Sequence, residues 1–253
     1  MISLLFLLLP IPTPPVYTAP APSEVQLAQG DAGQVTERIL NRIRTFRFFR
    51  SKISGANWGL DESRRFVIRS DEECLASLNE KNVPYERVVI PSGFVPTPVQ
   101  LTGPIDGVYF NKFENTPHPT ISCELADYLS RVVVPVFKSL GVIRVGVGSS
   151  YRTRPRESFH TMGMGLDVYR FEVQDSENFP EPTELVVRFN FQATPNQYTC
   201  DAQPRSPKAK KLLQIACALH PYFQSVLTPN YNRGHRDHFH LDIRPYDPRL
   251  FLR

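Results

Sequence analysis

Apolar residues recur every three or four positions in two segments near the start of the chain, and this spacing predicts amphipathic helices. The first helix covers 34–52 and places arginines between its apolar residues, so one of its faces is basic. That face is either a solvated surface or a contact site for a membrane or an anionic polymer. The second helix, 71–81, is shorter, and Asp71 is suited to cap its first turn.

The same spacing recurs twice further along the chain. A helix is predicted over 119–140, with a kink at Pro135 and an end at Gly141. Another is predicted over 208–219, because the Ser-Pro pair that precedes it supplies a cap and a first-turn proline.

Alternation of apolar and polar residues predicts strands over 142–147 and 238–243. Proline and glycine are frequent between 83 and 118, which favours loops or isolated strands there. A polar stretch that contains several prolines follows and ends at Pro204.

The N-terminal residues resemble an export signal. The largely apolar run 2–9 is closed by prolines, and small residues suited to cleavage follow at Ala19, Ala21 and Ala28. The usual basic residue before the run is missing, so an apolar tail that packs on the domain is the alternative interpretation. Residues 10–30 are rich in Pro, Ala and Gln and predict a flexible tether.

Composition excludes several classes of protein. The chain has 253 residues, of which 41% are hydrophobic and 21% charged, as expected for a globular protein. No run approaches the roughly 18 apolar residues of a membrane span, so a transmembrane channel or transporter is excluded. The net charge of +4 comes from 29 basic and 25 acidic residues spread along the chain, without the basic stripe of a nucleic-acid-binding protein.

The four cysteines indicate two disulfides and an oxidising compartment. They form an even set, and none lies in the CxxC spacing typical of zinc or redox sites. Three pairings are open to them. Proximity in the sequence favours Cys74 with Cys123 and Cys200 with Cys217.

A cluster of histidines near the C-terminus is the first sign of a metal site. His235, His238 and His240 lie within GHRDHFHLD, and an HxH pair on a strand places both imidazoles on one face. A second segment, SFHTMGMGLD, contains His160 and Asp167. Histidine and aspartate are ligands typical of zinc.

The glycines between His160 and Asp167 decide whether these two residues can share a metal. On a continuous helix, seven residues separate two side chains by about 10 Å along the axis, too far for one ion. Gly163 and Gly165 permit a tight turn that leads into a strand at Asp167. We therefore expect both side chains to converge. Without a metal, Asp167 would cap a turn and His160 would be a buried polar residue.

These residues also carry a resemblance to a known family. The first segment is similar to the SxHxxGxAxD motif of the zinc D-alanyl-D-alanine carboxypeptidase superfamily, with Gly165 where alanine is usual. The late (E/D)xxHxH motif of this superfamily resembles the segment with Asp237, His238 and His240, and Tyr151-Arg152 resembles its Tyr-Arg pair. More closely, FQSVLTPNYNRGHRDHFHLD resembles the extensin-like C-terminal domain family of bacterial envelope proteins. The resemblance covers roughly 70–245.

One departure limits what can be carried over. This family often has a cysteine soon after its SY segment, whereas Thr153 and its neighbours contain none. The resemblance therefore does not determine the disulfide pairing.

The resemblance implies a catalytic zinc site. His160, Asp167 and His240 would be the zinc ligands, and a fourth position would be left for water, as in catalytic sites. Zinc lowers the pKa of such a water to about 7. Arg152 would stabilise an oxyanion or hold a substrate carboxylate; a surface salt bridge is its alternative role.

The resemblance also supplies candidates for the general base. Asp237, three residues before His240, would be the base, and His238 would line the site and orient the base or the substrate. If 237–242 were one regular strand, Asp237 would face away from His240. Asp237 must therefore lie in a loop for this role, and His235 is the substitute base otherwise.

We expect an α+β domain, a small mostly antiparallel sheet flanked by helices, with a single zinc site. The expected organisation is a signal-like segment and tether over 1–30, an N-terminal helical extension over 31–69, and an extensin-like zinc peptidase-type domain over 70–253. The expected function is zinc-dependent hydrolysis of peptide bonds in bacterial cell-wall (peptidoglycan) peptide, as a carboxypeptidase or endopeptidase. The alternative is a non-catalytic, zinc-containing envelope module that binds cell-wall polymer. Either protein would be exported to the periplasm or cell envelope, with no nucleic acid as partner.

Overall fold

A computed structural model describes residues 68–91, 95–111, 116–155, 158–194, 199–244 and 251–252. All of them lie in the larger of two compact units, Asp31–Arg253. The segment expected over 1–30 and the helix expected over 34–52 lie outside the described residues. Within the described part of the chain, no helix has both the length and the apolar character needed to cross a membrane.

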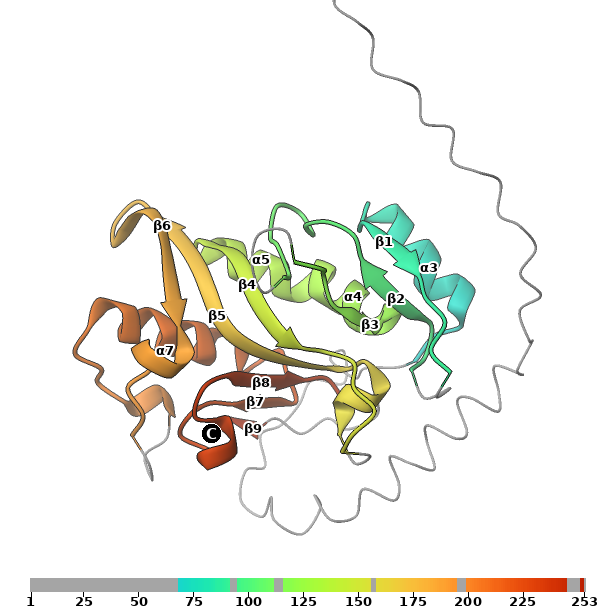
Figure 1. Ribbon diagram of the computed structural model, residues 1–253. Helices are drawn as coiled ribbons and strands as arrows, with labels where there is room; N and C mark the ends of the chain where they lie inside the picture. Colours follow the sequence, from blue (N-terminus) through green and yellow to red (C-terminus); the bar gives the residue numbers. More distant parts are fainter. Residues whose placement is uncertain are drawn as a thin grey trace, which may run out of the picture. The chain divides into compact units, whose positions relative to one another are not determined.

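The larger of two sheets carries six strands (Figure 1). Its hydrogen-bonded order is β4-β5-β8-β7-β9, and β6 also pairs with β5. Every pairing is antiparallel except that of β7 with β9. The strands are β4 (Val142–Ser149), β5 (Gly165–Asp175), β6 (Phe179–Val186), β7 (Ser225–Leu227), β8 (Phe239–Asp242) and β9 (Phe251–Leu252).

A smaller antiparallel sheet has the order β1-β2-β3, with β1 (Tyr85–Arg87), β2 (Pro98–Leu101) and β3 (Thr120–Ser122). Helix α3 (Asp71–Glu80) precedes it, one residue shorter than expected. The cap of α3 is Ser70 rather than Asp71, because the Ser70 hydroxyl and the Glu73 carboxylate satisfy each other's backbone N–H groups. The two sheets and their helices confirm the α+β class.

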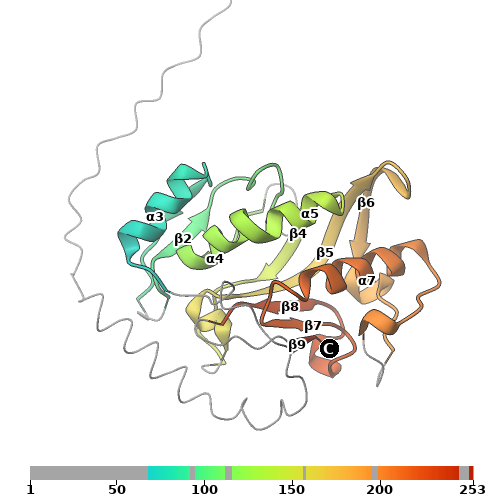
Figure 2. The same cartoon turned by 180° about the vertical axis from the view of Figure 1, so that it is seen from behind.

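The long helix expected over 119–140 begins later and is interrupted. Ser122 caps α4 (Cys123–Tyr128), a single π-helical turn follows over Leu129–Val133, and α5 (Val134–Ser139) completes it. The interruption lies just before Pro135, which lacks the N–H that a regular turn needs. Figure 2 shows α5 and α7 (Pro207–Leu219) in front of the six-stranded sheet, on one of its faces, whereas α4 contacts β2 and β3 of the smaller sheet.

The hairpin of β5 and β6 was not expected from the sequence. Pro180 and Pro182 lie in β6, which pairs with β5 alone among the described strands, and an edge strand tolerates residues without an N–H donor. The Asp175 carboxylate stabilises the turn by accepting the backbone N–H groups of Asn178 and Phe179. Helix α6 (Val187–Asn190) follows. The polar, proline-bearing stretch that ends at Pro204 thus contains a strand and a short helix that the sequence pattern did not indicate.

Both disulfides form with the pairing favoured by sequence proximity. Cys74–Cys123 joins α3 to α4, and Cys200–Cys217 joins a short 3-10 turn, Thr199–Asp201, to α7. Among the described residues no cysteine is free.

Candidate metal centre

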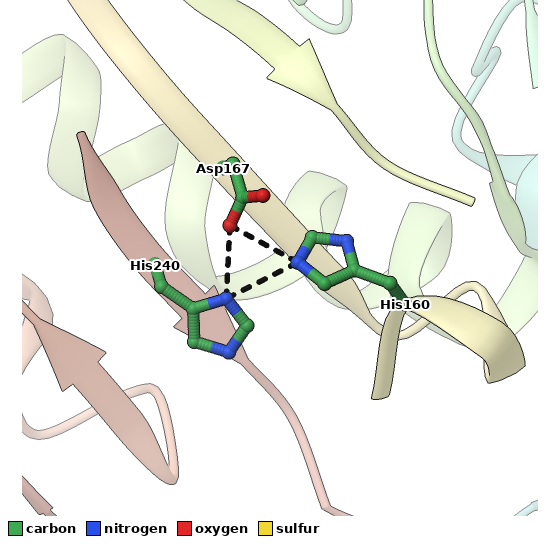
Figure 3. Close-up of side chains that lie close together, drawn as sticks. All are labelled: His160, Asp167 and His240. Carbon is green, nitrogen blue, oxygen red and sulfur yellow. Dashed lines mark hydrogen bonds and ion pairs between the residues drawn. The ribbon is translucent and has the colours of Figure 1, made fainter. Parts of the chain in front are cut away.

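The pairing of β5 with β8 places Asp167 directly opposite His240 (Figure 3). Leu166 and Val168, the neighbours of Asp167 on β5, are buried in the hydrophobic core. Side chains alternate along a strand, so Asp167 projects from the opposite face of the sheet. The two residues thus meet because of the register of two strands.

His160 reaches the same place from a 3-10 turn, Phe159–Met162, just before β5. Gly163 ends this turn with φ 65°, and a Cβ there would lie 2.6 Å from the Ser122 backbone nitrogen. A Cβ on Gly165 would lie 3.3 Å from the His160 ring. Both glycines therefore allow the reversal that brings His160 beside Asp167, as expected from the sequence.

Three donor atoms converge in this structure. Asp167 Oδ1 lies 3.0 Å from His160 Nε2 and 3.0 Å from His240 Nδ1, and the two nitrogens are 3.2 Å apart. Tetrahedral ligands that are 2.0–2.1 Å from zinc are about 3.3 Å from one another. The observed spacing is close to that value, so these three residues could hold a zinc ion.

The outer nitrogen of each imidazole has its own acceptor. His160 Nδ1 lies 2.5 Å from the Ser150 carbonyl oxygen, and His240 Nε2 lies 3.0 Å from Asp242 Oδ2. Each ring therefore donates its outer proton, so the inner nitrogen of the neutral imidazole carries a lone pair. When both rings are neutral, two lone pairs and a carboxylate oxygen face one another, an arrangement suited to a cation, either a proton or a metal ion.

The charges around the centre favour the ionised carboxylate. Burial opposes ionisation of Asp167, but the hydrogen bonds and charges of His160 and His240 outweigh it and hold the Asp167 pKa well below its usual range. Burial also opposes protonation of His240. The hydrogen bonds to Asp167 and Asp242 outweigh that effect and raise the His240 pKa to about 9. A proton is thus held strongly where a metal would otherwise bind.

Behind His240, sequence reasoning missed a buried pair, Asp242 and Arg244. Arg244 Nε donates to Asp242 Oδ1 at 2.8 Å, and its guanidinium also bonds the Ser225 hydroxyl and lies over the Phe159 ring. Asp242 is 2% exposed and Arg244 7%. The signal in the sequence was the spacing of Asp242, two residues after His240 on a predicted strand and hence on the same face.

Arg152 lies on the outer side of Asp167. Its Nη1 donates to Asp167 Oδ2 at 3.2 Å, while the side chain remains 40% exposed. Its buried Nε has no hydrogen-bond partner among the described residues. The guanidinium therefore neutralises the carboxylate and still reaches solvent beside the centre.

Asp237 and His238 form a pair at the edge of the centre. Strand β8 begins at Phe239, so Asp237 lies in the turn before it, which is the condition for its expected role. Asp237 Oδ1 accepts a hydrogen bond from His238 Nδ1 at 2.9 Å, and His238 Nε2 lies 3.5 Å from Asp167 Oδ1. Asp237 is thus connected to Asp167 through His238.

The His235 imidazole also lies beside the centre. Its centroid is 5.2 Å from that of His238 and 5.9 Å from that of His240, and its Nδ1 bonds Asn232 Oδ1. Burial, followed by the charges of His240 and His238, lowers the His235 pKa to about 4. A neutral imidazole with one bonded nitrogen is a second candidate for the base.

Comparison with known proteins identifies one family for this chain. Neither the curated proteins nor the solved structures include a match to this chain. Residues 72–250 match the family described as Extensin-like protein C-terminus, a span that contains every residue of the centre. The chain therefore belongs to the extensin-like C-terminal family.

Proposed function

We propose that this protein binds one zinc ion through His160, Asp167 and His240 and hydrolyses peptide bonds of bacterial cell-wall peptide. The convergence of two imidazole lone pairs and a buried carboxylate is the observation that carries the proposal. The similarity of both motifs to those of the zinc D-alanyl-D-alanine carboxypeptidase superfamily supports the choice of substrate. Carboxypeptidase and endopeptidase action are both compatible with this centre.

Zinc, when bound, polarises a substrate carbonyl and lowers the pKa of a coordinated water to about 7. The protein must then accept a proton, and Asp237 and His235 are the candidates. Asp237 is the base that the resemblance implies, three residues before His240, whereas the His235 ring lies 5.9 Å from the His240 ring, centroid to centroid. His238 orients Asp237 through the hydrogen bond from its Nδ1.

Arg152 would stabilise negative charge on the substrate. A guanidinium has five N–H donors in a fixed fork, and the ion pair with Asp167 uses one of its nitrogens. Its exposed part can therefore bind an oxyanion or a substrate carboxylate while the ion pair keeps the side chain in place.

We place the protein outside the cytoplasm, in the periplasm or cell envelope. The two disulfides support this location, because disulfides persist in oxidising compartments. The signal-like residues at the start of the chain agree with it.

The rival function is a non-catalytic envelope module in which zinc has a structural role. A site that only holds zinc needs its ligands and their orienting partners, such as Asp242. It does not need the Asp237–His238 pair, the neutral His235 or the half-exposed Arg152. Their presence beside the ligands favours hydrolysis.

Incubation of the zinc-loaded protein with purified muropeptides, followed by mass spectrometry, tests the proposal. We expect a mass loss that corresponds to cleavage of a peptide bond, and no cleavage by His240→Ala. Loss of the general base should lower kcat by about 10² to 10⁴-fold while zinc content is retained, so Asp237→Asn and His235→Gln identify which residue has that role. Stoichiometric zinc with no cleavage of any muropeptide, together with retention on cell-wall polymer, would establish the module instead.

A further inference from the structure

Tyr169, which lies at a β-bulge in β5, has its side chain beside the centre and was not expected there from the sequence. In the pairing with β4, Val168 lies opposite Val147 and Arg170 opposite Gly146, so Tyr169 is an extra residue. Val168 is fully buried on the core side, whereas Tyr169 and Arg170 are both partly exposed. Alternation along the strand places Tyr169, two residues after Asp167, on the face that carries Asp167, and the bulge leaves Arg170 partly exposed as well before Phe171 returns to the core.

The Tyr169 ring lies against the backbone of Gly148 on β4. A Cβ on Gly148 would lie 2.4 and 2.5 Å from two carbons of that ring. Any larger residue there would displace Tyr169. Gly148 is therefore a glycine because of the space that the ring occupies.

The Tyr169 ring also contacts His238. The two rings are stacked, with centroids 5.1 Å apart and planes inclined by 30°. His238 is the residue that bonds Asp237 through Nδ1 and approaches Asp167 through Nε2. The tyrosine thus packs between a glycine backbone and the imidazole that connects the candidate base to a candidate ligand.

We propose that Tyr169 is a positioning residue, whose ring packs between Gly148 and His238 and so fixes the His238 imidazole and, through it, the Asp237 carboxylate. The effect on turnover rests on the proposed hydrolytic function, whereas the effect on the orientation of His238 does not. A flat ring is required for this role, and a phenolic hydroxyl is not, so phenylalanine should replace Tyr169 and leucine should not.

The surroundings of the hydroxyl agree with a neutral ring. Burial raises the Tyr169 pKa, and the nearby charges of Asp167 and Asp237 raise it further, against the opposing effect of Arg152. The phenol therefore stays protonated at neutral pH, and the ring carries no charge that would disturb the carboxylates.

Nitrogen NMR of the histidine side chains tests the positioning role directly, in the full-length zinc-loaded protein. The His238 signals are assigned by their loss in His238→Gln. In the wild type and in Tyr169→Phe, we expect the Nδ1-protonated tautomer and ring protons shifted upfield by the stacked ring. In Tyr169→Leu the upfield shift should disappear and the tautomer signals should become mixed. Tyr85→Leu, in the smaller sheet, is the matched control and should leave these signals unchanged.

Kinetics on a muropeptide gives the second readout. Tyr169→Leu should lower kcat by about 3- to 10-fold with KM changed by less than about twofold, and Tyr169→Phe should restore kcat. Zinc should remain stoichiometric in both. If the protein cleaves no muropeptide, the proposed function fails, and the NMR result alone decides the role of Tyr169.

Unchanged His238 signals in Tyr169→Leu would overturn the inference, as would equal effects of phenylalanine and leucine. Gly148→Ala provides an independent test if Tyr169→Leu does not fold, because its methyl group must displace the ring while the tyrosine is retained. The same change in the His238 signals is expected there, and its absence would also overturn the inference.

Discussion

Substitution of Asp242, whose carboxylate lies behind His240, should affect zinc affinity and folding stability in ways that can be measured separately. Asp242 accepts the Nε2 proton of His240 at 3.0 Å and bonds the buried Arg244 guanidinium at 2.8 Å. Asp242→Ala therefore has two consequences. His240 loses the partner that turns its Nδ1 toward the centre, and Arg244 loses its acidic partner.

The two consequences differ in size and in kind. Loss of a carboxylate that orients a ligating histidine typically weakens metal binding by about 10- to 100-fold, which is about 1.4 to 2.7 kcal/mol. A buried charge deprived of its partner costs about 3 to 5 kcal/mol of folding free energy. We therefore expect Asp242→Ala to bind zinc more weakly and to unfold at a lower urea concentration even without zinc.

A double variant distinguishes these effects. Asp242→Ala with Arg244→Met removes the stranded charge and should recover most of the stability, but zinc binding should stay weak because His240 is still unsupported. Zinc affinity is measured by competition with a chromogenic chelator, and stability by urea unfolding of the metal-free protein. Wild-type zinc affinity in Asp242→Ala, or recovery of affinity in the double variant, would refute the reasoning.

Two further predictions follow from particular residues. Gly163→Ala should destabilise the protein by more than about 1–3 kcal/mol, because its φ of 65° strains alanine and the added methyl group meets the Ser122 backbone. Gly107→Ala, at φ 84° with open space around it, is the control and should show the cost of the backbone strain alone. Thermal unfolding of the two variants measures the difference. The hydrogen bond from Lys211 lowers the Asp175 pKa to about 2, below about 3.9 in an unfolded chain, so its stabilisation is complete above about pH 4 and is lost as the pH falls toward 2. The urea concentration at the unfolding midpoint should fall as the pH is lowered from 5 to 2, and Lys211→Met should reduce this fall. An equal fall in Lys211→Met would contradict the role of Lys211 in lowering the Asp175 pKa.

Much of the candidate centre could be predicted because its signals are local. The HxH spacing brings His238 and His240 to one face, and both rings approach Asp167 in the structure. Gly163, between His160 and Asp167, predicted the turn that its positive φ provides. A short spacing that allows only one local geometry can be interpreted from the sequence, without knowledge of the fold.

Other features depend on pairing between distant segments. The bulge at Tyr169 is defined by the register of β5 with β4. The run DVYRFEV has no regular period of two, so the sequence alone does not show where the alternation of the strand is interrupted. Strand β6 was missed because prolines oppose a strand unless it lies at an edge, which only the sheet order reveals. The support that Arg244 gives to Asp242 likewise depends on its contacts with Ser225 in β7 and with the Phe159 ring.

Zinc K-edge X-ray absorption on the purified protein, together with its metal content, tests the central claim most directly. The account predicts one zinc per chain with two imidazole nitrogens and light oxygen ligands at about 2.0–2.2 Å and no sulfur, because both disulfides occupy the cysteines. In His240→Ala the stoichiometric zinc should be lost. A full equivalent of tightly bound zinc in that variant, sulfur in the ligand shell, or a protein that takes up no zinc would contradict it.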